Sequence, residues 1–327
     1  MKKNYFMLAA AAMMFAACSE TDMVSEMGEM EKAQEINFES FAQKTTRAEI
    51  TGESALQSTA GFKVWGTKTY SSTPTTVFDG VKVYYSGGAW TYDNKKYWDE
   101  TATYDFYAVA PFDAKSSISD GKITIVDVAS GKSADSQDYL IDRDGETGVD
   151  GSVKAVVPFD FNHTMAKLSF VLKAGVAENI TVTSLTMTGW DNALGKFVQT
   201  LDATPTNNSK TEWSMQTPKV AGSATLVGTG AGDASILLPD TKAGVNVKDT
   251  YIMVPQTIAA NDLTFTINYT INGETFTAQA GSVTTAQTWG TDTHTTYTIT
   301  VAPNVINFDV NSVAGWTTKP EDSATIN

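Results

Sequence analysis

Short stretches in which apolar and polar residues alternate recur along most of this chain, and they restrict its fold more than any other feature. Residues 263–271, Leu-Thr-Phe-Thr-Ile-Asn-Tyr-Thr-Ile, place every second side chain on one face, as a half-buried strand requires. Asn272 and Gly273 then form a turn signal that leads into the next strand. Similar segments recur along the chain at intervals of roughly ten residues, separated by turn residues. The pattern predicts an all-β protein with mostly antiparallel sheets, because the connections are too short for crossover helices.

The chain is long enough for two domains. It has 327 residues, of which 42% are hydrophobic, so two cores of ordinary size are available. The sequence predicts two tandem antiparallel β-sandwich domains, one over residues 36–160 and one over residues 161–327. A segment of a different kind precedes the two predicted domains at the amino terminus.

The amino terminus is typical of an export signal that ends in a lipidated cysteine. Lys2 and Lys3 are followed by a mainly apolar run, residues 5–15, and then by two small residues, 16–17, before Cys18. We expect residues 1–17 to be a lipoprotein signal peptide and Cys18 to carry acyl chains such as palmitate. The alternative is an ordinary secretory signal in which the cysteine is incidental.

Residues 18–35 are expected to be a flexible lipidated tether. They are rich in Glu, Met and Ser and contain no aromatic residue, so they bury little apolar surface. Because the chain has one cysteine, it has no disulfide within itself. The apolar run before Cys18 is shorter than the ~20 residues of a membrane-spanning helix, so membrane attachment is expected to be through the lipid.

The charge of the chain argues against a nucleic-acid partner. Twenty-three Lys and Arg residues face 37 Asp and Glu residues, which gives a formal net charge of −14. A phosphate backbone is repelled by such a surface, and basic residues do not gather into a stripe.

Few residues could support catalysis. The two histidines are His163 and His294, and no Gly-x-Ser-x-Gly motif occurs. We expect His163 to be a hydrogen-bonded structural imidazole, and we expect no enzymatic activity and no cofactor. Residues 131–133 and 228–232 resemble parts of phosphate-binding loops, but both lack the required glycine spacing.

One acidic segment is a weak calcium candidate. Its carboxylates alternate on a predicted turn and could converge on an ion; they are Asp142, Asp144, Glu146 and Asp150. The segment breaks the EF-hand pattern, so a solvated hairpin loop is the favoured interpretation and no metal is assigned.

Aromatic residues are concentrated in the first domain, between Trp65 and Tyr107. Aromatic side chains on a β-surface can bind glycans or anchor a protein partner. A core with cross-strand aromatic pairs is the favoured alternative.

Residues 36–41, Ile-Asn-Phe-Glu-Ser-Phe, are the first strand candidate. Ile36 and Phe38 lie two apart and therefore face the same side of a strand, where they could fill the edge of the first sandwich. The polar residues 42–57 follow the strand and contain Arg47 and Ala48.

Several motifs together resemble the fimbrillin family of Bacteroidetes, the subunits of pili that are assembled from lipoprotein precursors. The matching stretches lie in the same order along nearly the whole chain; they are the signal with Cys18 and residues 62–65, 97–98, 104–111, 138–141, 159–168, 253–256 and 306–310, with Trp316.

The resemblance implies two transthyretin-like sandwiches, transport to the outer membrane and cell surface as a lipoprotein, and proteolysis after an arginine. The corresponding arginine is Arg47, so the cut is expected before Ala48 and would remove a first strand that contains Ile36, Phe38 and Phe41. The residues themselves favour this position, because Arg47 is one of two arginines and lies in a polar segment.

The function expected is that of a structural pilus subunit that supports cell adhesion and is assembled by donor-strand exchange. Its expected partners are other pilin subunits, an arginine-specific protease, and the outer membrane through Cys18. The short segment after Trp316 favours a tip or minor subunit. The alternatives are a monomeric surface lipoprotein that binds a glycan or a host protein, and a hydrolase on a β-scaffold.

Overall fold

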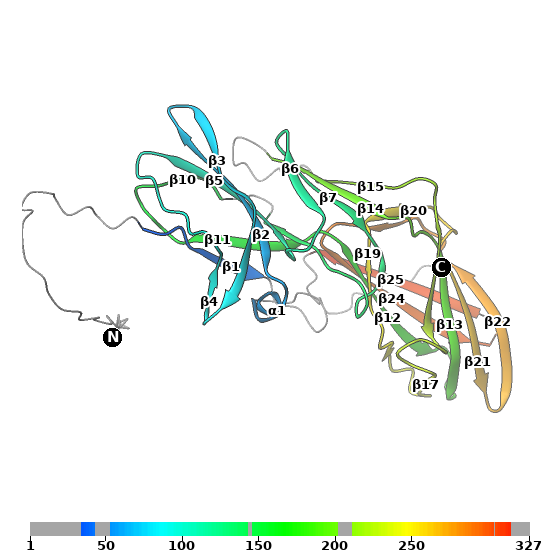
Figure 1. Cartoon of the computed structure of the whole chain (residues 1–327). Helices are drawn as coiled ribbons and strands as arrows, with labels where there is room; N and C mark the ends of the chain where they lie inside the picture. Colours follow the sequence, from blue (N-terminus) through cyan, green and yellow to red (C-terminus); the bar gives the residue numbers. More distant parts are fainter. Residues whose placement is uncertain (1–33, 43–52, 143–145, 202–210, 304, 315–327) are drawn as a thin grey trace, which may run out of the picture. The chain divides into compact units, whose positions relative to one another are not determined.

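The computed structural model describes residues 34–42, 53–142, 146–201, 211–303 and 305–314. This described chain consists of β-strands and one short helix, α1 (Glu53–Ser58), as Figure 1 shows. The predicted all-β class is therefore confirmed. No helix in the described part has the length and apolarity needed to cross a bilayer.

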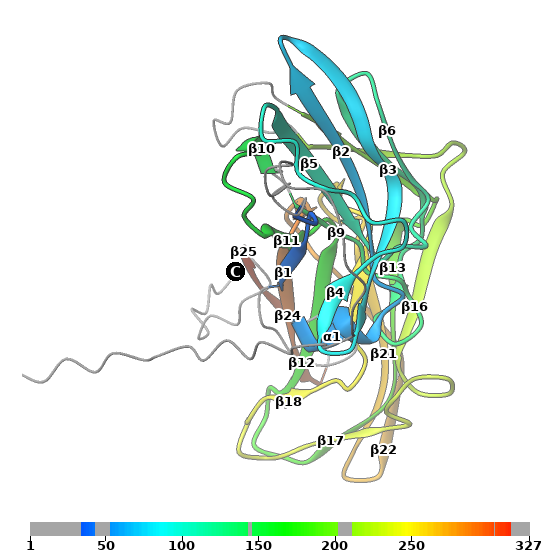
Figure 2. The same ribbon diagram turned by 60° about the vertical axis from the view of Figure 1, so that its left-hand side comes forward.

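An eight-stranded sheet contains most of the strands that precede residue 164. Its order is β1 (Phe38–Ala42), β11 (Val157–His163), β9 (Leu140–Asp142), β5 (Thr103–Ala110), β2 (Phe62–Tyr70), β3 (Thr73–Ser86) and β4 (Ala89–Thr91), and β10 (Glu146–Asp150) pairs with β5. The first strand, β1, lies at one end of this order, next to β11 (Figure 2).

Two larger sheets contain most of the strands that follow residue 164. One has the order β25 (Val305–Ala314), β24 (Thr293–Ala302), β12 (Ala166–Ala174), β19 (Tyr251–Met253) and β8 (Gly131–Lys132), with β18 (Val245–Asn246) paired to β12. The other has the order β16 (Ala221–Val227), β13 (Ile180–Asp191), β21 (Thr264–Ile271) and β22 (Glu274–Ser282), with β17 (Ile236–Leu238) paired to β13.

Two smaller sheets complete the described fold. One has the order β15 (Thr211–Met215), β14 (Gly195–Thr200), β7 (Lys122–Val128) and β6 (Ser116–Ser119). The other pairs β20 (Gln256–Ile258) with β23 (Gln287–Trp289). The β7–β14 and β8–β19 pairs join strands from before and after residue 160.

The local sequence explains the clearest strands. In β21, the apolar residues are buried and the threonines between them are partly exposed, which matches the alternation of the sequence. Asn272 and Gly273 follow with φ of 50° and 86°, as a type I′ hairpin turn requires, and Ile271 pairs with Glu274. The predicted hairpin is confirmed.

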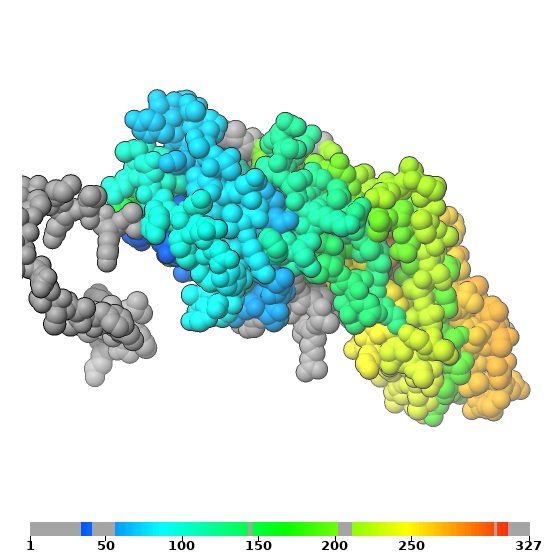
Figure 3. All heavy atoms as spheres, in the orientation of Figure 1, coloured from blue at the N-terminus to red at the C-terminus, as the bar shows by residue number. Residues whose placement is uncertain are grey.

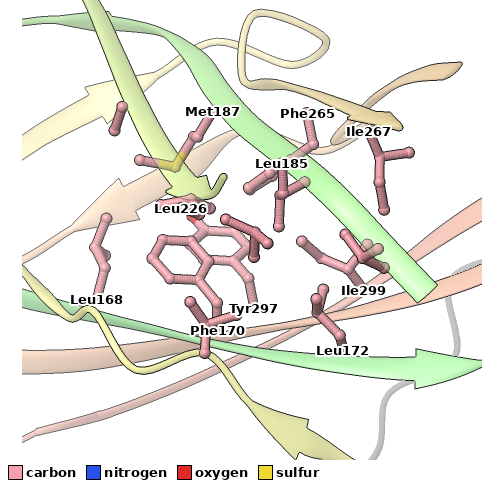
Figure 4. Packing of buried hydrophobic residues seen from close by; sticks show 14 of the residues in the cluster. Leu168, Phe170, Leu172, Leu185, Met187, Leu226, Phe265, Ile267, Tyr297 and Ile299 are labelled. Atoms are coloured by element: carbon pink, nitrogen blue, oxygen red, sulfur yellow. The ribbon is translucent and has the colours of Figure 1, made fainter. Parts of the chain in front are cut away.

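Buried apolar side chains form three clusters. The largest takes its members from residues 166–301, and Figure 4 shows part of it, with Phe170 and Tyr297 facing Leu185 and Phe265. A second, rich in aromatic residues, takes its members from residues 36–161. The third combines side chains from both halves, among them Trp65 and Phe197. The expected boundary at 160/161 falls inside β11.

Two features differ from the expectations. The described pairs β1–β11 and β12–β24 are parallel, whereas the sequence predicted mostly antiparallel sheets within antiparallel sandwiches. The polar segment 42–57 contains the start of α1, whose Leu56 is fully buried in the aromatic core. A single buried leucine is too weak a periodic signal to predict a six-residue helix.

Candidate functional site

Residues 34–42, here called the amino-terminal segment, form hydrogen bonds along both of their edges. On one side β1 pairs in parallel with β11, with Phe38 opposite Val157 and Ser40 opposite Phe159. On the other side, Glu35 forms an antiparallel bridge with Tyr97. The segment therefore changes its partner within a few residues.

Backbone hydrogen bonds fix the first half of this segment. Ile36 N donates to Lys96 O at 2.9 Å, and Trp98 N donates to Gln34 O at 3.0 Å. Near the transition to β1, Val157 N donates to Asn37 O at 2.9 Å. These bonds depend on the backbone and not on the side chains of the segment, so another extended chain could form them too.

Polar side chains add two further contacts. Tyr92 Oη donates to Ile36 O at 2.8 Å, and burial raises the pKa of Tyr92 to about 12, which keeps this donor protonated at physiological pH. Lys95 forms an ion pair with Glu35. This pair is about one third exposed on each side, so it contributes little to stability.

The inward face of the amino-terminal segment is buried. Ile36 is 0% exposed and Phe38 is 4% exposed. Asn37, which lies between them, and Glu39, which follows Phe38, are exposed. This confirms that Ile36 and Phe38 share one face. The side chain of Phe41 is not among those described. Little of this segment, coloured dark blue, is visible between the cyan strands in Figure 3.

Aromatic rings surround Phe38. Its ring centroid lies 5.3 Å from that of Phe78 and 5.6 Å from that of Phe159, and the rings of Tyr92 and Phe106 lie within 6 Å. Burial of Ile36 and Phe38 contributes on the order of 2 kcal/mol for each side chain. Without the segment, these rings would line an open apolar groove between β11 and residues 96–98.

The residues expected to be processed lie outside the described residues. Cys18, Arg47 and Ala48 all belong to the ranges without a description. Arg47 and Ala48 lie in the link between β1, which ends at Ala42, and α1, which begins at Glu53. A cut in this link separates the amino-terminal segment from the remainder of the chain without breaking a described strand.

The calcium candidate gains no support. Asp142 is buried at the end of β9, Glu146 and Asp150 belong to β10, and Asp144 lies outside the described residues. Burial raises the pKa of Glu146. The described residues contain no group of three or more side chains placed to hold a metal ion.

The two histidines make separate contacts. His163 is buried, and its Nδ1 lies 2.8 Å from Asp138 Oδ2, as expected of a structural imidazole. His294 Nε2 lies 2.9 Å from Ser169 Oγ, which is also 2.9 Å from Thr296 Oγ1. Sequence reasoning missed this second contact, because its residues are 125 positions apart and meet only through the parallel pairing of β12 and β24.

The Ser169–His294 contact lacks the features of a catalytic pair. Burial and the nearby Lys167 lower the pKa of His294 to about 4. The charge beside this histidine is thus a cation, the opposite of the carboxylate that orients the histidine of a catalytic triad. His294 is also only 9% exposed. We describe the contact as structural.

The two glycine motifs contact each other. Lys132 pairs with Asp249 at 2.9 Å and donates to Gly230 O at 2.6 Å. Gly232 N donates to the same Asp249 carboxylate. In the described chain neither motif opens a helix.

Most aromatic residues between Trp65 and Tyr107 are buried in a core, as favoured. Trp65, Trp90, Tyr92, Trp98, Tyr104 and Phe106 are all buried. Tyr70, Tyr85 and Tyr97 are exceptions, at 61%, 37% and 53% exposed. Tyr97 lies directly beside the amino-terminal segment.

A cleft of about 690 Å³ lies in the second half and was not predicted. Trp190, Asp191 and Gln256 contribute to its lining. Gln256 Oε1 accepts from Asp191 N, and its Nε2 donates to Asp191 O. The side-chain amide of Gln256 is thus engaged with the backbone of Asp191.

Comparison with known proteins identifies the family. The model of the fimbrillin-like family matches residues 46–316. The chain belongs to this family. The resemblance noted from the sequence motifs is therefore confirmed. This fimbrillin-like chain matches no functionally curated protein.

Two solved structures share the fold of this fimbrillin-like protein. A fimbrial protein from Bacteroides vulgatus has a TM-score of 0.64 and 19% identity, and the match covers 86% of this chain and 99% of that one. A protein from Bacteroides uniformis, described as a candidate cell adhesion protein, has a TM-score of 0.50 and 12% identity, with 86% and 99% covered. At these identities the likeness establishes the fold alone.

Proposed function

We propose that this fimbrillin-like protein is a pilus subunit whose groove receives an extended strand from another subunit after its own amino-terminal segment is removed. The protein reaches the outer membrane with its lipid on Cys18. An arginine-specific protease then cuts between Arg47 and Ala48. The segment leaves, and a donor strand replaces it and supports a fibre on the cell surface.

The double-edged pairing of the amino-terminal segment carries this proposal. Residues 34–36 are hydrogen-bonded to residues 96–98, and residues 37–42 pair through the opposite edge with β11, so both edges of the segment are used although β1 itself lies at the end of the sheet. Removal exposes the aromatic rings around Phe38 together with unpaired backbone donors and acceptors. Such a surface favours the capture of another extended chain.

The position of the link makes removal possible. Residues 43–52 connect β1 to α1, and both ends of this link are held by the aromatic core through Phe38 and Leu56. Cleavage in the link makes the segment replaceable, because the remaining contacts are non-covalent. The replaced burial then stabilises the polymer.

An anchored monomer that binds a glycan or a host protein is the alternative. Exposed Tyr85 and Tyr97 would be its contact residues. Both lie on the half of the chain that carries the groove, so a bound partner and an inserted strand could influence each other.

The deciding experiment compares wild-type protein with the Arg47→Ala variant. Each is mixed with an arginine-specific protease and a purified donor subunit, and polymers are detected as heat-labile, detergent-resistant ladders. We expect ladders from wild type and folded, unpolymerised precursor from Arg47→Ala. Equal ladders, or cut wild-type protein that stays monomeric with every donor, would favour the anchored alternative.

A further inference from the structure

We propose that the groove selects donor strands with an apolar side chain at the position that Ser40 occupies, so that the protein's own segment is an imperfect occupant. The inference rests on the proposed function, because it concerns the partner of the same groove. Ser40 is the third inward-facing residue of the segment, after Ile36 and Phe38.

Ser40 lies in an apolar row. It is 2% exposed and pairs in register with Phe159, which is 0% exposed. The neighbouring inward residues of β11, Val157 and Phe161, are each 1% exposed. The side chain at position 40 therefore faces apolar residues of β11, as the side chain of Phe38 does.

The hydroxyl of Ser40 has no hydrogen-bond partner among the described groups. A hydroxyl loses its bonds to water on burial, and only a protein partner compensates for this loss. A methyl group in the same place has no such requirement. An alanine or a larger apolar residue at this position should therefore bind the groove more tightly than serine.

Two neighbouring features define the rest of the preferred strand. Asn37 and Glu39 are exposed, so the intervening positions tolerate many side chains. The pairing with β11 is parallel, so a donor in this slot runs in the same direction. The expected donor has apolar residues at three alternate positions, including the third.

This mismatch gives strand exchange a direction. The backbone bonds of the slot are available to any extended chain, so they do not discriminate between the released segment and a donor. The difference in affinity comes from the inward side chains. A donor that is apolar at the third position displaces the cut segment even when both are present at equal concentration.

Peptides provide the test. Wild-type protein is cut with an arginine-specific protease, and a fluorescent peptide of residues 34–42 is bound to it. Unlabelled peptides then compete: the unmodified sequence, its Ser40→Ala form, and the matched control Glu39→Ala at an exposed position. We expect Ser40→Ala to compete about tenfold more tightly, and Glu39→Ala to match the unmodified peptide.

Equal or weaker competition by the Ser40→Ala peptide would overturn this inference while leaving the proposed function intact, because the unmodified peptide still binds. If no peptide binds the cut protein, the proposed function fails, and the inference with it. A second measurement does not depend on exchange. The intact Ser40→Ala protein should unfold at a higher denaturant concentration than wild type, and a lower midpoint would contradict the penalty assigned to the hydroxyl.

Discussion

Tyr92 Oη donates a 2.8 Å hydrogen bond to the carbonyl oxygen of Ile36, a residue 56 positions earlier in the chain. The same phenol oxygen accepts from Lys96 N at 3.1 Å. One side chain thus joins the amino-terminal segment to the wall of its slot. The contact provides a direct way to loosen the segment without changing any residue of the segment itself.

Tyr92→Phe removes this bond and leaves the buried carbonyl of Ile36 with one partner fewer. We expect the free energy of unfolding to fall by about 1–2 kcal/mol, and the cut protein to release the fragment that ends at Arg47 faster. Denaturant unfolding and gel filtration of the cut protein measure these effects. Tyr97→Phe is the control, because Tyr97 is 53% exposed, and a loss of the same size there would argue against a specific role for Tyr92.

Gly66 in β2 allows two walls of the groove to approach each other. A Cβ atom at this position would lie 2.8 Å from Cδ1 of Phe106 and 3.0 Å from Cδ2 of Phe78, and both rings contact Phe38. We expect Gly66→Ala to displace these rings and to destabilise the protein by about 1–3 kcal/mol, as overpacking does. Unchanged denaturant unfolding would show that the rings have room to move.

Cys18→Ala should abolish lipid attachment, because only a thiol forms the thioether to the diacylglyceryl group. Metabolic labelling with a fatty-acid analogue and fractionation of the outer membrane measure the result. Phe15→Leu is the matched control, since leucine is the usual residue three positions before a lipidated cysteine, and this variant should keep its label. Undiminished label on Cys18→Ala would contradict the lipoprotein assignment.

His294 should make the protein less stable in acid. Its pKa is lowered to about 4 by burial and by Lys167, so the unfolded chain, with a histidine pKa near 6.5, binds the proton more readily. The contribution of His294 to the free energy of unfolding is fully present above about pH 6.5 and falls as the pH decreases towards 4. We expect a contribution of about 2 kcal/mol between these limits.

His294→Gln isolates this effect from the titration of carboxylates. The fall in unfolding free energy between pH 7 and pH 4.5 should be smaller in the variant than in wild type by about 2 kcal/mol. Chemical denaturation at the two pH values measures the difference. An identical fall in both proteins would mean that His294 does not titrate in this range.

Local patterns predicted part of the fold and of the candidate site. The alternation over residues 263–271 and the Asn272-Gly273 turn predicted a hairpin, and the spacing of Ile36 and Phe38 predicted their common face. Both features depend on neighbours in sequence. The local sequence was therefore sufficient to predict both features.

Long-range pairing was not predictable in the same way. Neither the parallel contact of Lys167 with His294 nor the pairing of β7 with β14 leaves a signature in either strand alone. The unpartnered hydroxyl of Ser40 was missed for a related reason: the spacing from Ile36 and Phe38 puts Ser40 on the inward face, but whether its hydroxyl has a hydrogen-bond partner depends on residues far away in the sequence. The apolar partners opposite Ser40 follow only from the register of β1 with β11.

The parallel ladder between β1 and β11 has a mechanical consequence. A chain in this slot that is pulled along its own axis loads all the hydrogen bonds of the ladder together, in shear, whereas a chain peeled from one end breaks them one after another. The additional bonds to residues 96–98 resist in the same direction. A joint of this geometry between two subunits would withstand tension along the strand far better than force applied across it.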